Sequence, residues 1–495
     1  MTMGVPVIVG VADIKNTSRE GIEPLDLMLE AISAALKDTR LSAANRGALQ
    51  SAIDSISVVA NWTWPYPDTP QRIASRLKCN PTHLCESEHG GNAPVQLLDD
   101  TARRIALGEV KVAVVTGGEA LASLAAYKEA RDFPPKSWTH LDDTTSILEQ
   151  PRPRNLANIH GLSLPTQVYP LYEAGFRAYR GQKLPDNHQE SSELYAQFSA
   201  VAAANPNAWR YRKPADMVDA ISTINKKNRL ICDPYPLLMN AFNTVNMAAA
   251  CIVTSTKLAQ TLGIPEEAWI YPVGGAGRDD NEEFWKRPNY YSSRSLSQSL
   301  DVALYESRLE KGDIDLFDFY SCFPIVPKLA SNHLGLSLTM SAKPVTLLGG
   351  LTSFGGAGNN YSLHAITEMV RQLRDGRGQN GLVLANGGLL SHHHTVCLSR
   401  HPRNDPLPYS TQPCPSSYVG DEHPPIVKRA EGPAVIETYT VQYNRDGSPQ
   451  AGFILGRMRN GGGRFIANAG DAATLKDLTS KVNEQIGDSK FNVGI

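Results

Sequence analysis

The sequence repeats one long pattern, and this internal duplication restricts the fold more than any short motif. Each copy contains an Ile-Asp strand, a Gly-Gly turn that opens a helix, and a second strand that ends in Gly-Gly. The first copy covers 53–62, 89–109 and 110–121, and the second covers 314–323, 354–376 and 380–391. Because the order, spacing and glycine positions agree over a period much longer than solenoid repeats, the pattern predicts a duplicated α/β domain.

A helix is also predicted before each Ile-Asp strand. The segments 25–38 and 299–313 carry apolar residues at helical spacing. Strands and helices therefore alternate in both halves, and we expect two mostly parallel sheets with helices covering their faces.

The composition excludes several function classes. The 495 residues include 48 Lys and Arg against 50 Asp and Glu, so the net charge offers no attraction for nucleic acid or an anionic membrane. The apolar run 247–253 is far too short to span a bilayer. The N-terminus lacks the pattern of a secretory signal, and the seven scattered cysteines show no zinc spacing. We therefore expect a cytoplasmic protein with free thiols, no membrane span, no nucleic-acid partner and no metal.

Three further segments interrupt or follow the duplicated halves. A long insertion separates the first copy from the small-residue strand 248–255, and it is expected to cap the first sheet. Its basic residues could meet phosphates or simply face solvent; they are Arg210, Arg212, Lys213, Lys226 and Lys227. A proline-rich stretch is predicted to be a linker or a chain wrapping the surface. Three strands and a short helix follow it.

These segments predict the following domains. The N-terminal half comprises 1–120 plus 241–265, and the cap comprises 121–240. The C-terminal half comprises 266–400, the linker 401–432, and a small β-barrel-like domain 433–495.

The helix of the first copy begins near Gly91 or Asn92, where Pro94 suits the first turn. A helix N-terminus stabilises an anion or a thiolate. Cys85 lies about six residues earlier, so we expect it to be a buried strand residue and not a nucleophile. Gly90, Gly91 and Asn92 occupy the favourable position instead.

The sequence resembles the thiolases, and specifically the sterol-carrier-type thiolases. "YSCF" (320–323) resembles their His-Asp-Cys-Phe motif, and "GGLTSFGGAG" (349–358) their Gly-Gly-x-x-x-x-Gly-His-Pro motif. "HGLSLPTQVYPLYE", "AAANPNAW", "NRLICDPYP" and "ANGGLLSHH" are similar to type-1 thiolase-like proteins, as is the C-terminal segment that begins "ETYTVQYNRDG". The resemblance implies a thiolase fold, which is two βαβα halves in a five-layer αβαβα arrangement with a capping domain and a C-terminal β domain.

The resemblance also shows which thiolase residues are missing. Counting back from Gly108 places Gly91 where thiolases have their nucleophilic cysteine. The His or Asn of the second motif falls on Tyr320, and the His of Gly-His-Pro falls on Gly356. The second catalytic cysteine falls near Asn386. A two-cysteine acyl transfer therefore cannot run here as it does in thiolases.

Other residues could still bind or activate a thioester. Backbone N–H groups and polar side chains can form an oxyanion hole, and a histidine can act as a base. The candidate catalytic residues are His89, Tyr320, Cys322 and His393. The candidate oxyanion or substrate-binding residues are Gly90, Gly91, Asn92, Ser321, Gly356, Asn359, Asn360, His364 and Asn386.

Two of these candidates have competing interpretations. Cys322 is either a thiol nucleophile or a structural residue. The run His392 to His394 suggests a metal site, a base from His393 or packed histidines, and metal is disfavoured because neighbouring strand side chains alternate faces.

The resemblance implies an acyl-CoA-dependent acyltransferase of lipid metabolism, working as a homodimer. It would transfer an acyl group from a CoA thioester to an acceptor without a cysteine-bound intermediate and without a covalently bound cofactor. The alternatives are a CoA- or acyl-CoA-binding protein with reduced catalysis and a thioester hydrolase. No Gly-Lys-Ser/Thr loop or Gly-x-Ser-x-Gly elbow indicates another enzyme class.

Overall fold

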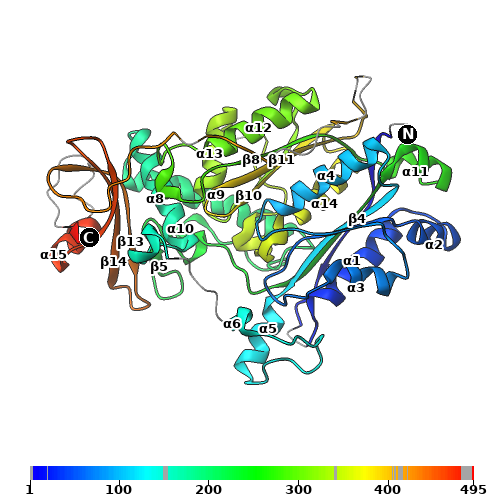
Figure 1. Ribbon diagram of the computed structural model, residues 1–495, viewed down its shortest axis with the longest axis horizontal. Coiled ribbons are helices and arrows are strands. Elements are labelled where there is room, and N and C mark those ends of the chain that lie inside the picture. The colour runs from blue at the N-terminus through cyan, green and yellow to red at the C-terminus, as the bar shows by residue number, and fades with distance from the viewer. Residues whose placement is uncertain are drawn as a thin grey trace.

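The computed structural model describes residues 4–18, 21–148, 154–338, 343–403, 405, 409–410, 416–420, 422–480 and 493–494. Figure 1 shows five layers, in which helices and sheets alternate from the lower right of the molecule to its top. The predicted αβαβα arrangement is confirmed.

The first sheet belongs to the N-terminal half. Its strand order is β1 (Pro6–Lys15), β7 (Asn246–Ser255), β4 (Val112–Ala120), β2 (Ser55–Val58) and β3 (His83–Glu86). β2 pairs in parallel with β3 and β4, whereas β7 runs antiparallel to β1 and β4. The helices of this half outside the central layer are α1 (Pro24–Asp38), α2 (Ala43–Ser51), α3 (Thr69–Leu77) and α11 (Thr256–Leu262).

The second sheet repeats this pattern. Its order is β12 (Ser416–Tyr418), β8 (Tyr271–Asp279), β11 (His392–Ser399), β10 (Asn380–Gly387) and β9 (Leu316–Phe319). β9 and β10 are parallel, and β11 is antiparallel to β8 and β10, as in the matching strands of the first half. The duplicated strand pairing therefore matches the repeat in the sequence. α12 (Arg294–Ser307) and α13 (Ile325–Leu334) lie on the outer side of this sheet (Figure 1).

The bounds of α12 differ from the predicted 299–313. The helix begins earlier because the Ser293 hydroxyl accepts a hydrogen bond from the Leu296 N–H and caps it. It ends earlier because Arg308 adopts a left-handed conformation with φ 57°. A short 3₁₀ turn, Lys311–Asp313, then leads into β9.

The central layer consists of α4 (Ala93–Leu107) and α14 (Tyr361–Arg374), which pack against each other and against both sheets. A charged side chain of each helix pairs with a residue in the sheet of the opposite half. Asp99 of α4 accepts hydrogen bonds from Arg103 and pairs with His394 of β11. Arg371 of α14 donates to Asp13 of β1 at 2.7 Å. Because these carboxylates are buried, the two networks fix how the halves dock.

The cap consists of helices that lie mostly on the C-terminal half. They are α5 (Leu121–Glu129), α6 (Thr145–Leu148), α7 (Leu156–Ile159), α8 (Pro165–Tyr179), α9 (Leu184–Ala204) and α10 (Val218–Ser222). Buried Lys328 of α13 donates to Glu173 of α8 at 2.6 Å and to Ser191 of α9 at 2.7 Å, which ties the cap to that half. α5 and α6 form a separate projection at the bottom of Figure 1.

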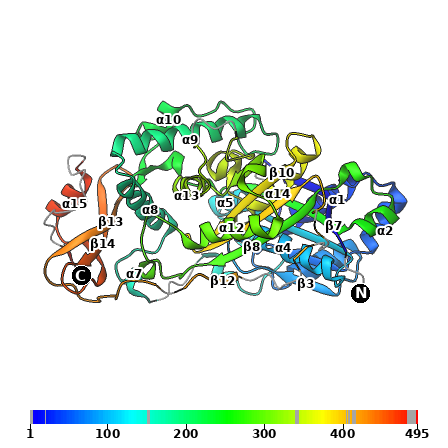
Figure 2. The same ribbon diagram turned by 90° about the horizontal axis from the view of Figure 1, so that it is seen from above.

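The third sheet lies at one end of the long axis (Figure 2). Its order is β16 (Val493–Gly494), β15 (Arg464–Ala469), β14 (Pro449–Met458), β13 (Ala434–Tyr443), β5 (Leu230–Cys232) and β6 (Tyr235–Pro236), with α15 (Ala472–Thr479) packed on it. The predicted boundary at 433 therefore does not enclose this sheet, because the cap supplies two of its strands. Likewise, β12 pairs with β8 inside the segment expected to be a linker.

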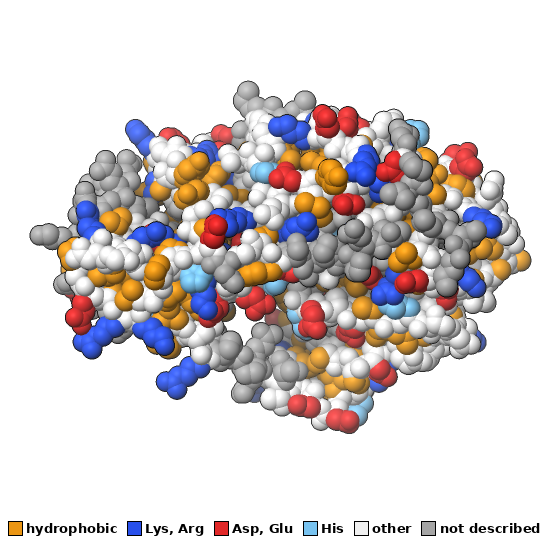
Figure 3. All heavy atoms as spheres, turned by 45° about the horizontal axis from the view of Figure 1, so that its top comes forward, with side chains coloured by type: hydrophobic (Ala, Val, Ile, Leu, Met, Phe, Trp, Pro, Cys, Tyr) orange, Lys and Arg blue, Asp and Glu red, His pale blue; other side chains and the backbone are white. Residues whose placement is uncertain are grey.

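The surface agrees with the near-neutral composition. On the face shown in Figure 3, lysine and arginine side chains are interspersed with acidic ones. Among the described residues, no helix is long and apolar enough to cross a membrane.

We predict that Asp13 stabilises the fold above about pH 4. Burial by itself raises the pKa of Asp13, but Arg371 and hydrogen bonds from His364 and Thr367 outweigh it and lower this pKa to about 2. The stabilisation, about 2 kcal/mol, is present above the pKa of an unfolded aspartate and is lost as the pH falls towards 2. The unfolding temperature of Asp13→Asn should lie below that of the wild type, and this difference should become smaller below about pH 4.

Asp375→Asn provides the control, because Asp375 is an exposed residue at the end of α14, the helix that carries Arg371. It should leave the acid dependence unchanged. If the difference in unfolding temperature between Asp13→Asn and the wild type is constant from pH 7 to pH 3, the ionised Asp13 carboxylate does not stabilise the fold.

Candidate functional site

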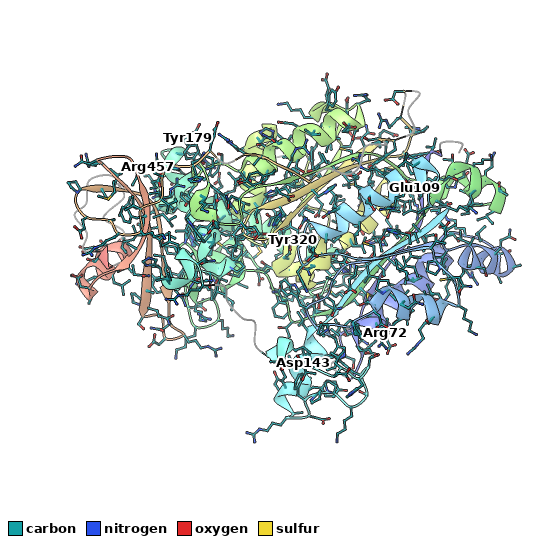
Figure 4. All side chains as sticks on the ribbon, viewed as in Figure 1. Arg72, Glu109, Asp143, Tyr179, Tyr320 and Arg457 are labelled. Atoms are coloured by element: carbon teal, nitrogen blue, oxygen red, sulfur yellow. The ribbon has the colours of Figure 1, made fainter. Side chains whose placement is uncertain are left out.

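The candidate site lies where the start of α4 meets the segment that follows β9. Gly91 precedes the first turn of α4, and Tyr320 directly follows β9 from the other half. Figure 4 shows Tyr320 near the centre of the molecule. Residues more than 200 positions apart therefore share one small region, as the sequence resemblance implies.

Position 91 has no room for a side chain. A Cβ built on Gly91 lies 2.5 Å from the Tyr320 hydroxyl oxygen and also collides with the backbone carbonyl of Asn386. Carbon and oxygen atoms do not approach this closely without displacing one another. The phenol of Tyr320 thus occupies the space into which a nucleophilic side chain at 91 would project.

The Tyr320 hydroxyl is a proton donor in this environment. Tyr320 is 7% exposed, and its ring packs edge-on against Tyr361 with ring centres 5.5 Å apart. Burial and the nearby Cys322 thiol raise the pKa of Tyr320 far above that of a free phenol. In the described part of the chain its hydroxyl has no hydrogen-bond partner. A neutral hydroxyl with an unused proton can donate to an oxygen but is a poor nucleophile.

Cys322 and Asn386 lie beside this phenol. The Asn386 side-chain amide donates to the Tyr169 hydroxyl at 2.8 Å and approaches the Cys322 sulfur at 3.7 Å. Its Oδ1 is buried without a partner. Burial raises the pKa of the Cys322 thiol to about 12, so the thiol stays protonated at neutral pH. This favours the structural interpretation of Cys322.

His89 reaches the same region, but its ring orientation is set by Asn359. The Asn359 carbonyl oxygen accepts from the Trp62 indole at 3.1 Å, and its amide nitrogen donates to the Ala60 carbonyl at 2.7 Å. An indole N–H only donates and a carbonyl only accepts, so these two bonds fix which end of the Asn359 amide is the NH₂ group. This NH₂ group lies 3.0 Å from His89 Nδ1 and must donate to it. Neutral His89 therefore carries its proton on Nε2 and presents no free basic nitrogen.

The remaining binding candidates line the same turns. Asn360 donates to the Gly117 carbonyl at 2.8 Å and keeps an unpartnered, buried Oδ1. Asn92 lies close against Gly90 and Gly387 and leaves no space for side chains there, and Gly356 is equally crowded by the Asn243 side chain. Ser321 is fully buried, and its carbonyl accepts from Tyr195 of the cap.

Two predicted histidines make their hydrogen bonds with residues outside this region, although His393 lies directly opposite Asn386 across β10 and β11. His393 bonds the Ser295 hydroxyl of α12 at 2.9 Å, so it faces the outer layer, whereas its neighbour His394 faces α4. Alternation along β11 turns the His393 and His394 side chains to opposite faces of the sheet, and no hydrogen bond joins His393 to Tyr320 in the described part of the chain. His364 bonds Asp13 of β1 at 2.5 Å and belongs to the network that joins the halves.

Cys85 is also remote from the start of α4. It lies in the edge strand β3 and is half-buried, which is less buried than the sequence predicts. The His392 to His394 run holds no metal-ligand cluster among the described residues.

Sequence reasoning missed Glu119, which directly follows the Gly117-Gly118 pair that ends β4. The carboxylate accepts hydrogen bonds from the Trp62 and Thr63 backbone N–H groups at 2.8 and 3.0 Å. Burial nevertheless raises the pKa of Glu119 to about 7. Its carboxylate also crowds Gly358, two residues before Asn360. A glutamate at the end of a buried strand, after two glycines, was the available signal.

Comparison with known proteins gives the following similarities. Residues 413–491 match the family model of the thiolase-like protein type 1 additional C-terminal domain. The crystal structure of a monomeric SCP2-thiolase like protein type 1 from Mycobacterium smegmatis is 31% identical, with a TM-score of 0.82, over 98% of this chain and 95% of that chain. No curated protein matches the chain.

Two more distant structures share the fold. The Ltp2–ChsH2(DUF35) aldolase is 18% identical with a TM-score of 0.61, over 81% of this chain and 98% of that chain. Acetyl-CoA acetyltransferase from Syntrophomonas wolfei is 14% identical with a TM-score of 0.55, over 81% of this chain and 100% of that chain.

We predict that Gly91→Ala destabilises the protein although alanine adds one methyl group. Its Cβ must displace Tyr320 and the Asn386 backbone, and overpacking of this kind costs about 1–3 kcal/mol. The thermal unfolding temperature should fall by several degrees.

Gly47→Ala is the matched control. Gly47 lies on the exposed side of α2 with open space around its Cα, so alanine should stabilise that helix slightly. Equal effects of the two substitutions would show that position 91 is not crowded.

Proposed function

The chain belongs to the SCP2-thiolase-like protein type 1 family, and from this we propose that it transfers an acyl group from a CoA thioester directly to an acceptor. The transfer uses no acyl-cysteine intermediate. One observation carries the proposal: the Tyr320 hydroxyl fills the space that a side chain at position 91 would need.

The Tyr320 proton is suited to hold the thioester oxygen. As an acceptor atom bonds the carbonyl carbon, negative charge develops on that oxygen, and a buried O–H stabilises the charge more strongly than water does. The C–S bond then breaks, and CoA leaves as the thiol with the proton that the acceptor gives up. The unpartnered Asn360 and Asn386 oxygens are acceptors that can orient the N–H or O–H groups of the substrates.

Direct transfer is supported because neither position 91 nor the Cys322 thiol offers a nucleophile. Gly91 offers no nucleophile, and burial keeps the Cys322 thiol protonated. Glu119 is a buried carboxyl that is linked to Asn359 through Trp62, and its pKa of about 7 allows it to exchange protons at neutral pH.

A second candidate function is the binding of CoA or acyl-CoA without turnover. The observation that favours it is the absence of a free basic nitrogen on His89, together with the placement of His393 in the outer layer. The homodimer, the cytoplasmic location and the role in lipid metabolism remain predictions. The 31% identical relative is described as monomeric, so sedimentation of this protein is the direct test of the dimer.

We predict that Tyr320→Phe slows acceptor-dependent CoA release about a hundredfold, since one oxyanion donor is worth about that much. The release of free thiol from a panel of acyl-CoAs and acceptors is the measurement. Tyr305→Phe removes an exposed phenol from α12 and should not change the rate.

Each outcome separates the candidates. CoA release with an acceptor, together with an unmodified protein mass after incubation with acyl-CoA, supports direct transfer. An acylated protein contradicts it. Calorimetric binding of acyl-CoA with no release under any condition supports the binding protein, and release without an acceptor indicates a hydrolase.

A further inference from the structure

The Glu119 side chain holds a turn that lies outside its own strand. Its Oε1 accepts from the Trp62 N–H at 2.8 Å, and its Oε2 accepts from the Thr63 N–H at 3.0 Å and from the Thr63 hydroxyl at 2.5 Å. The Thr63 hydroxyl oxygen in turn accepts from the Ala120 N–H at 2.9 Å. The end of β4 and the segment that follows β2 are therefore joined by these four hydrogen bonds, and three of them end on one carboxylate.

Two further hydrogen bonds connect this turn to His89. The Trp62 indole donates to the Asn359 carbonyl oxygen at 3.1 Å, and the Asn359 NH₂ group donates to His89 Nδ1 at 3.0 Å. Glu119 also packs directly against the turn that carries Asn359, since a Cβ built on Gly358 would lie 2.1 Å from Glu119 Oε1. The Glu119 carboxylate is thus linked to a ring nitrogen of His89 through a continuous chain of hydrogen bonds.

The donors around the Glu119 carboxylate suit its ionised form. Protonation adds a hydrogen that needs an acceptor, but the Trp62 and Thr63 N–H groups can only donate. The Thr63 hydroxyl can accept this hydrogen only if it turns its own O–H away from Glu119. In either case the neutral carboxyl is a weaker acceptor for the two N–H groups, because a charged acceptor forms the stronger hydrogen bond.

Burial opposes the ionised form. It raises the pKa of Glu119 to about 7, although the hydrogen bonds from the Thr63 hydroxyl and from the Trp62 and Thr63 N–H groups act in the other direction. Both forms of the carboxyl are therefore populated near neutral pH, and a small change in pH alters how firmly the turn is held.

Glu119 titrates without a countercharge. The charged or titratable side chains on β1, on α14 and in the segment before α4 are Lys15, Asp13, His364, Arg371 and His89. Met247 of β7 lies opposite both Glu119 and Lys15, and the Lys15 ammonium is bonded to two cap carbonyls. Burial and hydrogen bonds account for the raised pKa of Glu119, and no charged group of the described residues contributes to it.

We propose that Glu119 is a positioning residue of the candidate site. Its ionised carboxylate holds the Trp62–Thr63 turn in place, so that the Trp62 indole fixes Asn359 and Asn359 fixes His89 with its proton on Nε2. Loss of the charge loosens the turn and lets the His89 ring change its tautomer. Any effect on catalysis rests on the proposed function, whereas the effect on His89 does not.

Histidine NMR on the full chain tests the far end of this hydrogen-bond chain without any substrate. At about pH 8.5 the ¹⁵N signals of His89, which are assigned by their loss in His89→Gln, should show the proton on Nε2. Glu119→Gln keeps the size of the side chain but removes its charge, and Trp62→Phe removes the indole N–H. Each variant should shift the His89 signals towards a mixture of the two tautomers.

Tryptophan fluorescence tests the turn itself, because Trp62 is partly exposed. The Trp62 contribution, taken as the wild type minus Trp62→Phe, should change with a midpoint near pH 7, where Glu119 gains its proton. The change should persist in the His89→Gln background and be lost in the Glu119→Gln background. A change that persists without the Glu119 carboxyl would overturn the proposal.

Glu23→Gln is the matched control. Glu23 is also a buried glutamate that accepts three hydrogen bonds, from the Tyr66 hydroxyl and from the Thr139 N–H and hydroxyl, but these bonds do not lead to Asn359. This variant should leave both the His89 tautomer and the Trp62 transition unchanged. Equal effects of Glu23→Gln and Glu119→Gln would show a general loss of structure and overturn the proposal.

The remaining outcomes separate this proposal from the proposed function. If His89 keeps its proton on Nε2 in Glu119→Gln, Glu119 does not position it, whether or not CoA is released in the activity assay. If both spectroscopic effects are found but no acyl-CoA releases CoA, the proposed function fails and the role of Glu119 stands. Should Glu119→Gln not fold, the wild-type Trp62 transition and the His89 tautomer in Trp62→Phe decide, and the absence of either effect overturns the proposal.

Discussion

Two buried ion-pair networks, one on each central helix, hold the halves of the molecule in register. Asp99 of α4 pairs with His394 of the second sheet, and Arg371 of α14 pairs with Asp13 of the first sheet. Hydrogen bonds and charge from His394 and Arg103 hold the pKa of Asp99 well below its usual range, although burial opposes them. A buried charge without its partner is costly, so sliding one half against the other is disfavoured.

The candidate site depends on this docking because its two main residues come from different halves. Gly91 opens α4, and Tyr320 follows β9. The two positions are also complementary: a side chain at 91 would expel the phenol, and the phenol fills the space where thiolases have their thiol. The glycine at position 91 and the buried Tyr320 hydroxyl are therefore one structural feature. The proposed chemistry accordingly relies on polarising a carbonyl and not on a covalent acyl-enzyme.

The cap is held on the two halves of the molecule by different lysines. Lys328 and its partners anchor α8 and α9 on the C-terminal half. At the other side, Lys15 holds the segment after α9 against the N-terminal half. The cap thus bridges both halves, and Lys15, which holds it on the N-terminal half, lies at the same end of the first sheet as Glu119.

Patterns along the chain were enough to predict the duplication, most strands and helices, the family resemblance and the absence of a thiol at position 91. These features depend on local periodicity and on motif order along the chain. Three features could be seen only in the folded molecule: the Tyr320 hydroxyl fills the space at Gly91, Asn359 fixes the His89 tautomer, and His393 bonds α12. The same holds for the hydrogen bonds from Lys15 to the cap. Such outcomes depend on how segments more than a hundred residues apart pack, which the pattern within any one segment does not encode.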